Sequence, residues 1–92
     1  MGYFVYILRC FDDTLYTGIT TDLQRRVGEH NGENSKGNLG SKYTAARRPV
    51  VLVYAQSFTN RSESSKEELR IKKLIRSDKE LLIHTHPSLK KI

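Results

Sequence analysis

The sequence predicts an α+β fold in which helices pack on a small antiparallel sheet. Two apolar runs of strand length, 3–10 and 15–20, are separated only by turn-forming residues, which is typical of a hairpin. A third apolar run, 49–58, opens with a proline, and helix-capping signals lie on both sides of it. The expected order is therefore ββαβαα, with a three-stranded antiparallel sheet and no internal domain boundary.

The turn of the hairpin decides on which face of the sheet two tyrosines lie. If Tyr6 and Tyr16 enter one site, their side chains must lie on the same face of the sheet. Side chains alternate between the two faces along a strand, so this requires a register in which the residue numbers of each cross-strand pair add up to an even number. A two-residue turn made by Asp12 and Asp13 would give an odd sum and opposite faces. We therefore predict a three-residue loop or a bulge.

A first helix is expected directly after the hairpin. Thr21, with Gln24 three residues later, resembles a capping box, and apolar residues then recur at helical spacing to about residue 31. The next segment, 31–48, is rich in Gly, Asn, Ser and Lys and lacks sustained periodicity. It is expected to be a long mobile loop.

Two further helices are expected after the third strand. Asn60 is the predicted cap of a helix that runs to about residue 76, and Ser77 begins a short helix after it. The C-terminal residues 85–92 are expected to fray. The predicted domain therefore comprises residues 1–84.

Composition favours a polyanionic partner. Sixteen Lys and Arg against ten Asp and Glu give a net charge of +6 over 92 residues, so nucleic acid is the leading partner class, and an ordinary basic protein is the alternative. The single cysteine, Cys10, fits a reducing compartment and is expected to pack in its strand. We find no bilayer-spanning run and no secretory signal, so we expect a cytoplasmic protein without a membrane partner.

Two adjacent arginines on the first predicted helix are not equivalent. Arg26 falls on the flank of the stripe formed by Leu23, Val27 and His30, whereas Arg25 points nearly the opposite way. Arg26 and His30 are four residues apart and lie at the edge of the buried face. A partly buried cation beside an imidazole requires an anion or a function.

The hairpin tripeptides FVY at 4–6 and YTG at 16–18 resemble the two motifs that give the GIY-YIG endonuclease superfamily its name. Tyr6, Tyr16 and Gly18 stand in the motif positions. In the turn, Asp13 stands where the small stand-alone bacterial branch of this superfamily commonly has Gly, and Asp tolerates the left-handed conformation.

The resemblance extends from residue 3 to about 83. The segment DLQRRVGEH resembles the arginine-bearing helix of the family, and the separations from Tyr6 to Tyr16, Tyr16 to Arg26 and Arg26 to His30 are ten, ten and four residues, as the family pattern expects. The segment EELRIKK is similar to the family's Glu-x-x-aliphatic-Lys signature and places the metal-ligand carboxylate at Glu68.

The resemblance implies phosphodiester hydrolysis with one divalent ion. Glu68 would hold one Mg²⁺ or Mn²⁺ and Arg26 would pair with the scissile phosphate. Tyr16 would be the general base, with His30 accepting or relaying the proton. Tyr6 would position a phosphate or water, or merely pack in the hairpin. Helical spacing does not choose between the adjacent glutamates 67 and 68, so the choice rests on the motif.

We therefore expect a metal-dependent DNA endonuclease of low sequence specificity, acting on structured or single-stranded substrates and targeted by a protein partner. The alternative is a non-catalytic nucleic-acid-binding module that acts with such a partner. Further candidate contacts with nucleic acid share a basic or aromatic side chain, and solvated surface is their other interpretation. They are Lys42, Tyr43, Arg47, Arg48 and Lys72.

Overall fold

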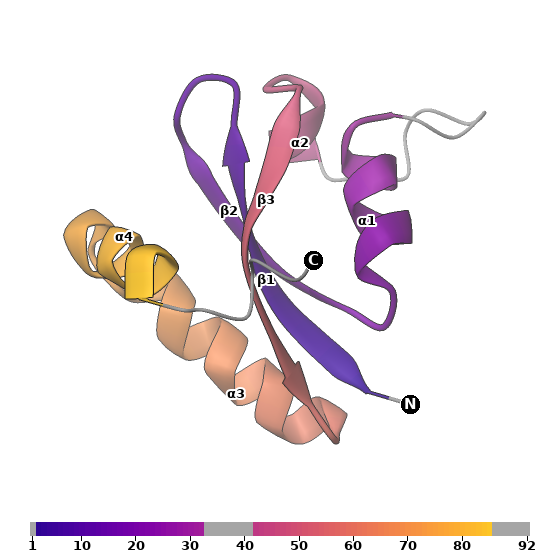
Figure 1. Ribbon diagram of the computed structural model, residues 1–92, viewed down its shortest axis with the longest axis vertical. Helices are drawn as coiled ribbons and strands as arrows, with labels where there is room; N and C mark the ends of the chain where they lie inside the picture. The colour runs from indigo at the N-terminus through magenta and orange to yellow at the C-terminus, as the bar shows by residue number, and fades with distance from the viewer. Residues whose placement is uncertain (1, 33–41, 86–92) are drawn as a thin grey trace.

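The computed structural model describes residues 2–32 and 42–85 (Figure 1). Its elements, in chain order, are β1 (Tyr3–Cys10), β2 (Leu15–Thr20), α1 (Leu23–His30), α2 (Lys42–Ala45), β3 (Val50–Phe58), α3 (Arg61–Lys72) and α4 (Arg76–Thr85). The three strands form one sheet in the order β2-β1-β3, and both pairings are antiparallel. The predicted α+β class, sheet and order of the main elements are confirmed.

Three boundaries differ from the prediction. The segment 31–48 was expected to lack regular structure, but it contains the short helix α2, and residues 33–41 lie outside the described part. Helix α3 ends at Lys72 rather than near residue 76, because a turn at 73–75 redirects the chain into α4. Of the tail expected to fray, only Thr85 is described, and it ends α4.

The hairpin has the predicted three-residue loop. Tyr6 pairs with Gly18 and Leu8 pairs with Tyr16, so the paired numbers have the even sum that places both tyrosines on one face. The loop closes through a hydrogen bond of 2.8 Å from the Cys10 amide to the Thr14 carbonyl. Asp13 adopts the left-handed conformation, with φ of 67°, which Asp tolerates better than most residues.

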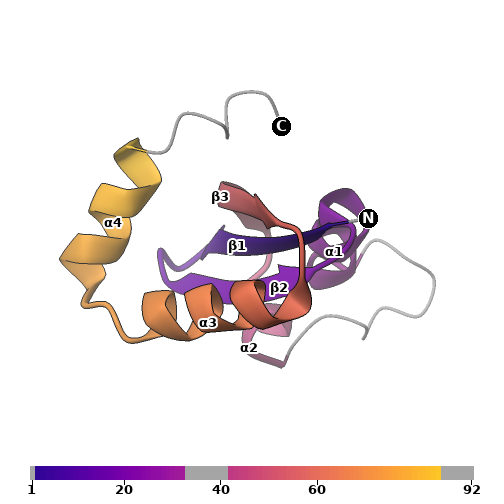
Figure 2. The ribbon, with the colours of Figure 1, turned by 90° about the horizontal axis from the view of Figure 1, so that it is seen from below.

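The sheet separates two small cores. On one face, Tyr6, Leu8 and Cys10 pack with Leu23 and Val27 of α1, so Cys10 is buried in its strand as predicted. On the other face, a second cluster joins β1 and β3 to α3 and α4, and its members include Val5, Ile7, Tyr54, Ile71, Leu82 and Ile83. Figures 1 and 2 show α1 and α4 on opposite sides of the sheet.

The N-caps fix where the helices begin. Asp22, not the predicted Thr21, caps α1: it has an extended backbone, and its carboxylate accepts a hydrogen bond of 3.1 Å from the Arg25 amide. This places α1 so that its buried stripe faces the sheet. Asn60 caps α3 as predicted, with its side chain accepting from the Glu63 amide at 2.9 Å.

Candidate active site

A chain of buried hydrogen bonds crosses from the sheet to both neighbouring helices. The Tyr6 hydroxyl lies 2.9 Å from Nε2 of His30, and Nδ1 of His30 lies 2.7 Å from the Thr44 hydroxyl. Tyr6, His30 and Thr44 are almost inaccessible to solvent. Arg26 also hydrogen-bonds the Tyr6 hydroxyl, and as a pure donor it requires the tyrosine oxygen to accept.

These partners define the proton positions in the chain. Because the Tyr6 oxygen accepts from Arg26, its own proton is available for Nε2 of His30, which then must be unprotonated. The remaining proton of His30 is on Nδ1 and is donated to Thr44. We infer this tautomer from the hydrogen-bond partners, and the imidazole is neutral in it.

The pKa shifts of Tyr6 and His30 agree with both side chains being neutral. Burial raises the pKa of Tyr6 to about 12, although the hydrogen bond and charge of Arg26 act in the opposite direction. Burial, followed by the positive charge of Arg26, lowers the pKa of His30 to about 4. Near neutral pH, Tyr6 therefore keeps its proton and His30 does not take a second one.

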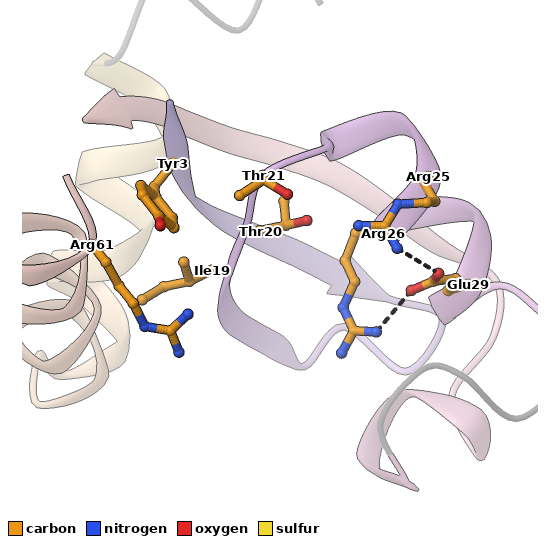
Figure 3. A pocket seen from close by; sticks show the side chains of 8 residues that line it. All are labelled: Tyr3, Ile19, Thr20, Thr21, Arg25, Arg26, Glu29 and Arg61. Carbon is orange, nitrogen blue, oxygen red and sulfur yellow. Dashed lines mark hydrogen bonds and ion pairs between the residues drawn. The ribbon is translucent and has the colours of Figure 1, made fainter. Parts of the chain in front are cut away.

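The side chain of Arg26 is less exposed than that of Arg25, as their positions on the helix predict. The side chain of Arg26 is 27% exposed and that of Arg25 is 56% exposed. Both reach Glu29, whose carboxylate accepts from Arg26 at 2.9 Å and from Arg25 at 3.2 Å (Figure 3). Arg26 thus connects a buried carboxylate to the Tyr6 hydroxyl while keeping part of its guanidinium accessible.

Gly18 provides the space that Tyr6 needs to reach these partners. A Cβ atom at Gly18 would lie 2.5 Å from the Tyr6 hydroxyl oxygen and 2.7 Å from Cζ. The two residues face each other across the strand pair, so the Tyr6 ring lies over the glycine. The atoms that a side chain at this position would meet belong to the Tyr6 side chain.

Tyr16 lies beside the hydrogen-bonded residues Tyr6, His30 and Thr44 and is not one of them. Its ring centroid is 5.0 Å from that of His30, 6.5 Å from that of Tyr6 and 5.9 Å from that of Tyr43. Both ring nitrogens of His30 are bonded to other residues, so Tyr16 meets His30 through a ring contact, and the proton relay between them stays a prediction. Tyr16 is only half-buried, whereas Tyr6 is 1% exposed.

The structure separates the two adjacent glutamates that helical spacing left open. The Glu68 carboxylate is close enough to contribute to the raised pKa of Tyr6, and it pairs with Lys72 at 3.1 Å. Glu67 instead accepts from Arg70 at 2.8 and 2.6 Å and acts electrostatically on Tyr54, in the core of the opposite face. Of these two glutamates, Glu68 is the one that acts electrostatically on the buried tyrosine of the candidate site.

Four of the residues expected to contact nucleic acid have contacts within the protein. Arg47 bonds Asp12 of the hairpin loop at 2.9 Å and lies 4.1 Å above the Tyr43 ring. Arg48 donates to the His30 carbonyl at 2.7 Å, at the end of α1. Lys72 pairs with Glu68, and the side chain of Lys42 lies outside the described part.

Sequence reasoning missed three residues that hold the site in place. Thr44 orients His30, Glu29 holds Arg26, and Asn31 bonds both backbone groups of Val50, at 2.7 and 3.0 Å. The three-residue separation of Arg26 and Glu29 on one helix was an available signal. Thr44 and Asn31 bond residues that are distant in the sequence, so no local sequence pattern predicts their roles.

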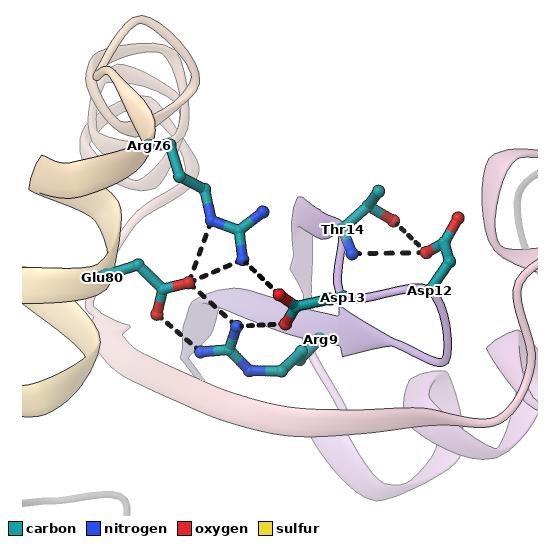
Figure 4. A network of polar contacts seen from close by, with 6 residues as sticks. All are labelled: Arg9, Asp12, Asp13, Thr14, Arg76 and Glu80. Atoms are coloured by element: carbon teal, nitrogen blue, oxygen red, sulfur yellow. Dashed lines mark hydrogen bonds and ion pairs between the residues drawn. The ribbon is translucent and has the colours of Figure 1, made fainter.

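An ion-pair network ties α4 to the hairpin next to the site (Figure 4). Arg9 bonds Glu80 at 2.6 and 2.9 Å and Asp13 at 3.0 Å, and Arg76 bonds the same two carboxylates at 2.7 and 3.3 Å. The hydrogen bond from Arg9, followed by that from Arg76, lowers the pKa of Glu80 to about 2. The network fixes the hairpin loop from the side opposite α1.

Residues 2–81 match the family model described as the GIY-YIG catalytic domain. A UPF0213 protein of Desulfotalea psychrophila is 49% identical over 82 residues, which cover 89% of this chain and 71% of the relative. A UPF0213 protein of Halobacterium salinarum is 50% identical over 78 residues, covering 85% and 95%.

Two solution NMR structures of relatives have the same fold. The UPF0213 protein of Bacillus halodurans superposes with a TM-score of 0.60 at 36% identity, covering 99% of this chain and 92% of that one. A protein of E. faecalis gives 0.58 at 38% identity, covering 89% and 83%. Among the described residues, no helix has the length and apolar character needed to span a membrane. With the family model matched from residue 2 to 81, the chain belongs to the GIY-YIG family.

Proposed function

We propose that this protein is a metal-dependent endonuclease that hydrolyses phosphodiester bonds in DNA with low sequence specificity. The family implies a nuclease and a nucleic-acid substrate. The observation that carries the proposal is the convergence of Tyr6, His30 and Arg26, with Glu68 acting electrostatically on the same tyrosine. The Tyr6 hydroxyl bonds both Arg26 and His30, and the Tyr16 ring lies against the His30 ring.

Arg26 is proposed to bind the scissile phosphate. Its guanidinium is permanently charged, and its planar fork matches phosphate oxygens. Glu29 and Tyr6 hold the side chain from two directions, while part of it remains exposed. The charge is therefore positioned before the substrate arrives, which is the arrangement that stabilises negative charge developing on the phosphate.

Tyr16 is proposed as the general base, and Tyr6 as a residue that positions Arg26 and His30. The Tyr6 hydroxyl is buried and already engaged by two partners, so it is not accessible to an attacking water. Tyr16 is half-buried and lies next to the same imidazole.

Glu68 is proposed to hold one Mg²⁺ or Mn²⁺. No group of three or more His, Cys, Asp or Glu side chains suited to a metal exists within residues 2–32 and 42–85. A single carboxylate still fits these ions, because Mg²⁺ keeps several waters and takes its other ligands from substrate phosphates. The bound ion would neutralise charge on the leaving oxygen. Lys72, now paired with Glu68, would then be released toward solvent or substrate.

The matched pair Glu68→Gln and Glu67→Gln tests the proposal. Both remove one charge from the same helix, but Glu68 acts electrostatically on Tyr6 whereas Glu67 acts on Tyr54. With labelled single-stranded, duplex and branched DNA and either Mg²⁺ or Mn²⁺, we expect Glu68→Gln to lose about 100-fold or more in single-turnover cleavage. Glu67→Gln should retain cleavage within about twofold, because its carboxylate bonds Arg70 and acts on Tyr54 of the opposite core rather than on Tyr6.

The same assay tests the alternative function. Equal loss in both variants, with unchanged folding, would refute the assigned metal site. Binding to the same DNA without cleavage in either metal would support a non-catalytic nucleic-acid-binding module that acts with a partner protein. The Arg26→Ala variant serves as an independent control, because it should abolish cleavage while leaving Glu68 intact.

A further inference from the structure

A polar pocket of about 310 Å³ lies outside the hydrogen-bonded chain described above. It is bounded by the start of β1, the end of β2, helix α1 and the first residue of α3 (Figure 3). Arg26 belongs both to this pocket and to the candidate active site, so the two lie side by side. The remaining lining residues are Tyr3, Ile19, Thr20, Thr21, Arg25, Glu29 and Arg61.

The charges around the pocket are unbalanced. Three arginines face one carboxylate, that of Glu29, which is 8% exposed and already bonds Arg25 and Arg26. Arg61 pairs with no carboxylate of the described residues, and it stands at the first position of α3, where the helix dipole disfavours a positive charge. An anion bound between Arg61 and Arg26 would compensate this excess.

We propose that this pocket binds a backbone phosphate next to the scissile phosphate on the same nucleic-acid strand. The proposal rests on the proposed function, because Arg26 would hold the scissile phosphate at the border of the two sites. Arg61 would be the principal contact of the neighbouring phosphate, and Arg25 a second one. Arg61 lies outside the motif segments that carry the resemblance to the family.

The neutral part of the pocket favours a nucleotide over a free anion. The side chains of Tyr3 and Ile19 lie next to Arg61 and offer partly exposed apolar surface to whatever binds there (Figure 3). A sugar ring attached to the phosphate would cover that surface, whereas inorganic phosphate would leave it in water. On the other wall, the Thr21 hydroxyl is exposed and suited to a phosphate oxygen.

Arg61→Ala and Lys66→Ala form the test pair. Both residues are exposed cations on α3 without an ion pair among the described residues, but Lys66 does not line the pocket. Fluorescence anisotropy with a labelled single-stranded oligonucleotide is measured without divalent ions over a series of salt concentrations. Arg61→Ala should weaken binding about 5- to 10-fold at low salt and reduce the salt slope by about 0.7 to 1. Lys66→Ala should change neither quantity measurably.

A second measurement locates the phosphate. Oligonucleotides with one uncharged methylphosphonate at successive positions should show a position where the substitution weakens binding to the wild-type protein but not to Arg61→Ala. Unchanged binding by Arg61→Ala, an equal loss in Lys66→Ala, or the absence of such a position would overturn the proposal. Competition by inorganic phosphate as strong as that by a dinucleotide would also overturn it.

The outcome is separable from that of the proposed function. If Arg61 affects binding but no cleavage is found with either metal, the phosphate pocket stands and the nuclease proposal fails. If cleavage requires Glu68 while Arg61→Ala binds like the wild type, the nuclease proposal stands and the pocket fails.

Discussion

Replacing Gly18 by Ala tests how the site is built. An alanine in the interior of a strand usually stabilises a protein by about 0.5 to 1 kcal/mol relative to glycine. Gly18 does not occupy the left-handed region, so its backbone accepts a side chain. The obstacle is Tyr6, whose hydroxyl oxygen would be 2.5 Å from the new Cβ, whereas ordinary contacts begin at 3.4 Å. The hydroxyl must therefore move by about 1 Å.

That movement breaks the hydrogen bond between Tyr6 and His30, now 2.9 Å long. An unsatisfied nitrogen on buried His30 costs about 1 to 3 kcal/mol, and overpacking costs a similar amount. We expect Gly18→Ala to lower the free energy of unfolding by about 3 kcal/mol after subtracting the backbone gain. For a domain of this size, the melting temperature should fall by about 15 °C.

Urea unfolding followed by circular dichroism measures the loss, and a double-mutant cycle assigns its cause. In a Tyr6→Phe background the hydrogen bond is already absent, so Gly18→Ala should cost about 1 to 3 kcal/mol less. If Gly18→Ala is as stable as the wild type or more stable, the argument that Gly18 exists to admit Tyr6 is refuted. An equal cost in both backgrounds would refute the role of the hydrogen bond.

Three further outcomes follow from the contacts. The pKa of His30 is lowered from 6.5 to about 4 in the folded protein, so as the pH falls the unfolded state is protonated at a higher pH than the folded state. The free energy of unfolding should therefore fall by up to about 1.4 kcal/mol per pH unit between about pH 6.5 and 4. Urea titrations should show this slope, and its persistence in His30→Asn would contradict the assignment. Glu80→Gln should lower the free energy of unfolding by about 1 kcal/mol at neutral pH. Because the pKa of Glu80 is lowered to about 2, the wild type should lose this stability as the pH falls from about 4.5 to 2, and the variant should not. Thermal melts over that pH range measure the difference. Asn31→Ala should cost about 1 to 2 kcal/mol and speed amide exchange at Val50, and unchanged exchange would contradict its bonding role.

The hairpin was predictable because its constraints are local. The parity of the tyrosine positions required a three-residue loop, and Asp13 could adopt the left-handed turn conformation. The difference between Arg25 and Arg26 also followed from helical geometry alone. These features depend on residues close in sequence, so the periodicity of a strand or of a helix is sufficient to predict them.

The hydrogen-bond partners were not predictable in the same way. The tyrosines and His30 were expected to share a site, but the sequence did not show that the ring of Tyr6 crosses Gly18 and that its hydroxyl bonds Nε2 of His30. Arg47 and Arg48 look like free loop cations until Asp12 and the end of α1 are placed beside them. Such contacts join segments that are 18 to 35 residues apart, where no periodicity applies.

The hydrogen-bonded series from Arg26 through Tyr6 and His30 to Thr44 joins helix α1 to the central strand β1 and to α2. The helix that carries the arginine is therefore locked to the central strand in advance, and no rotamer freedom has to be lost there when a strand of nucleic acid arrives. Under the proposed function, little of the binding free energy would be spent on ordering this side chain, and a domain with few contacts would still align a single phosphodiester for attack.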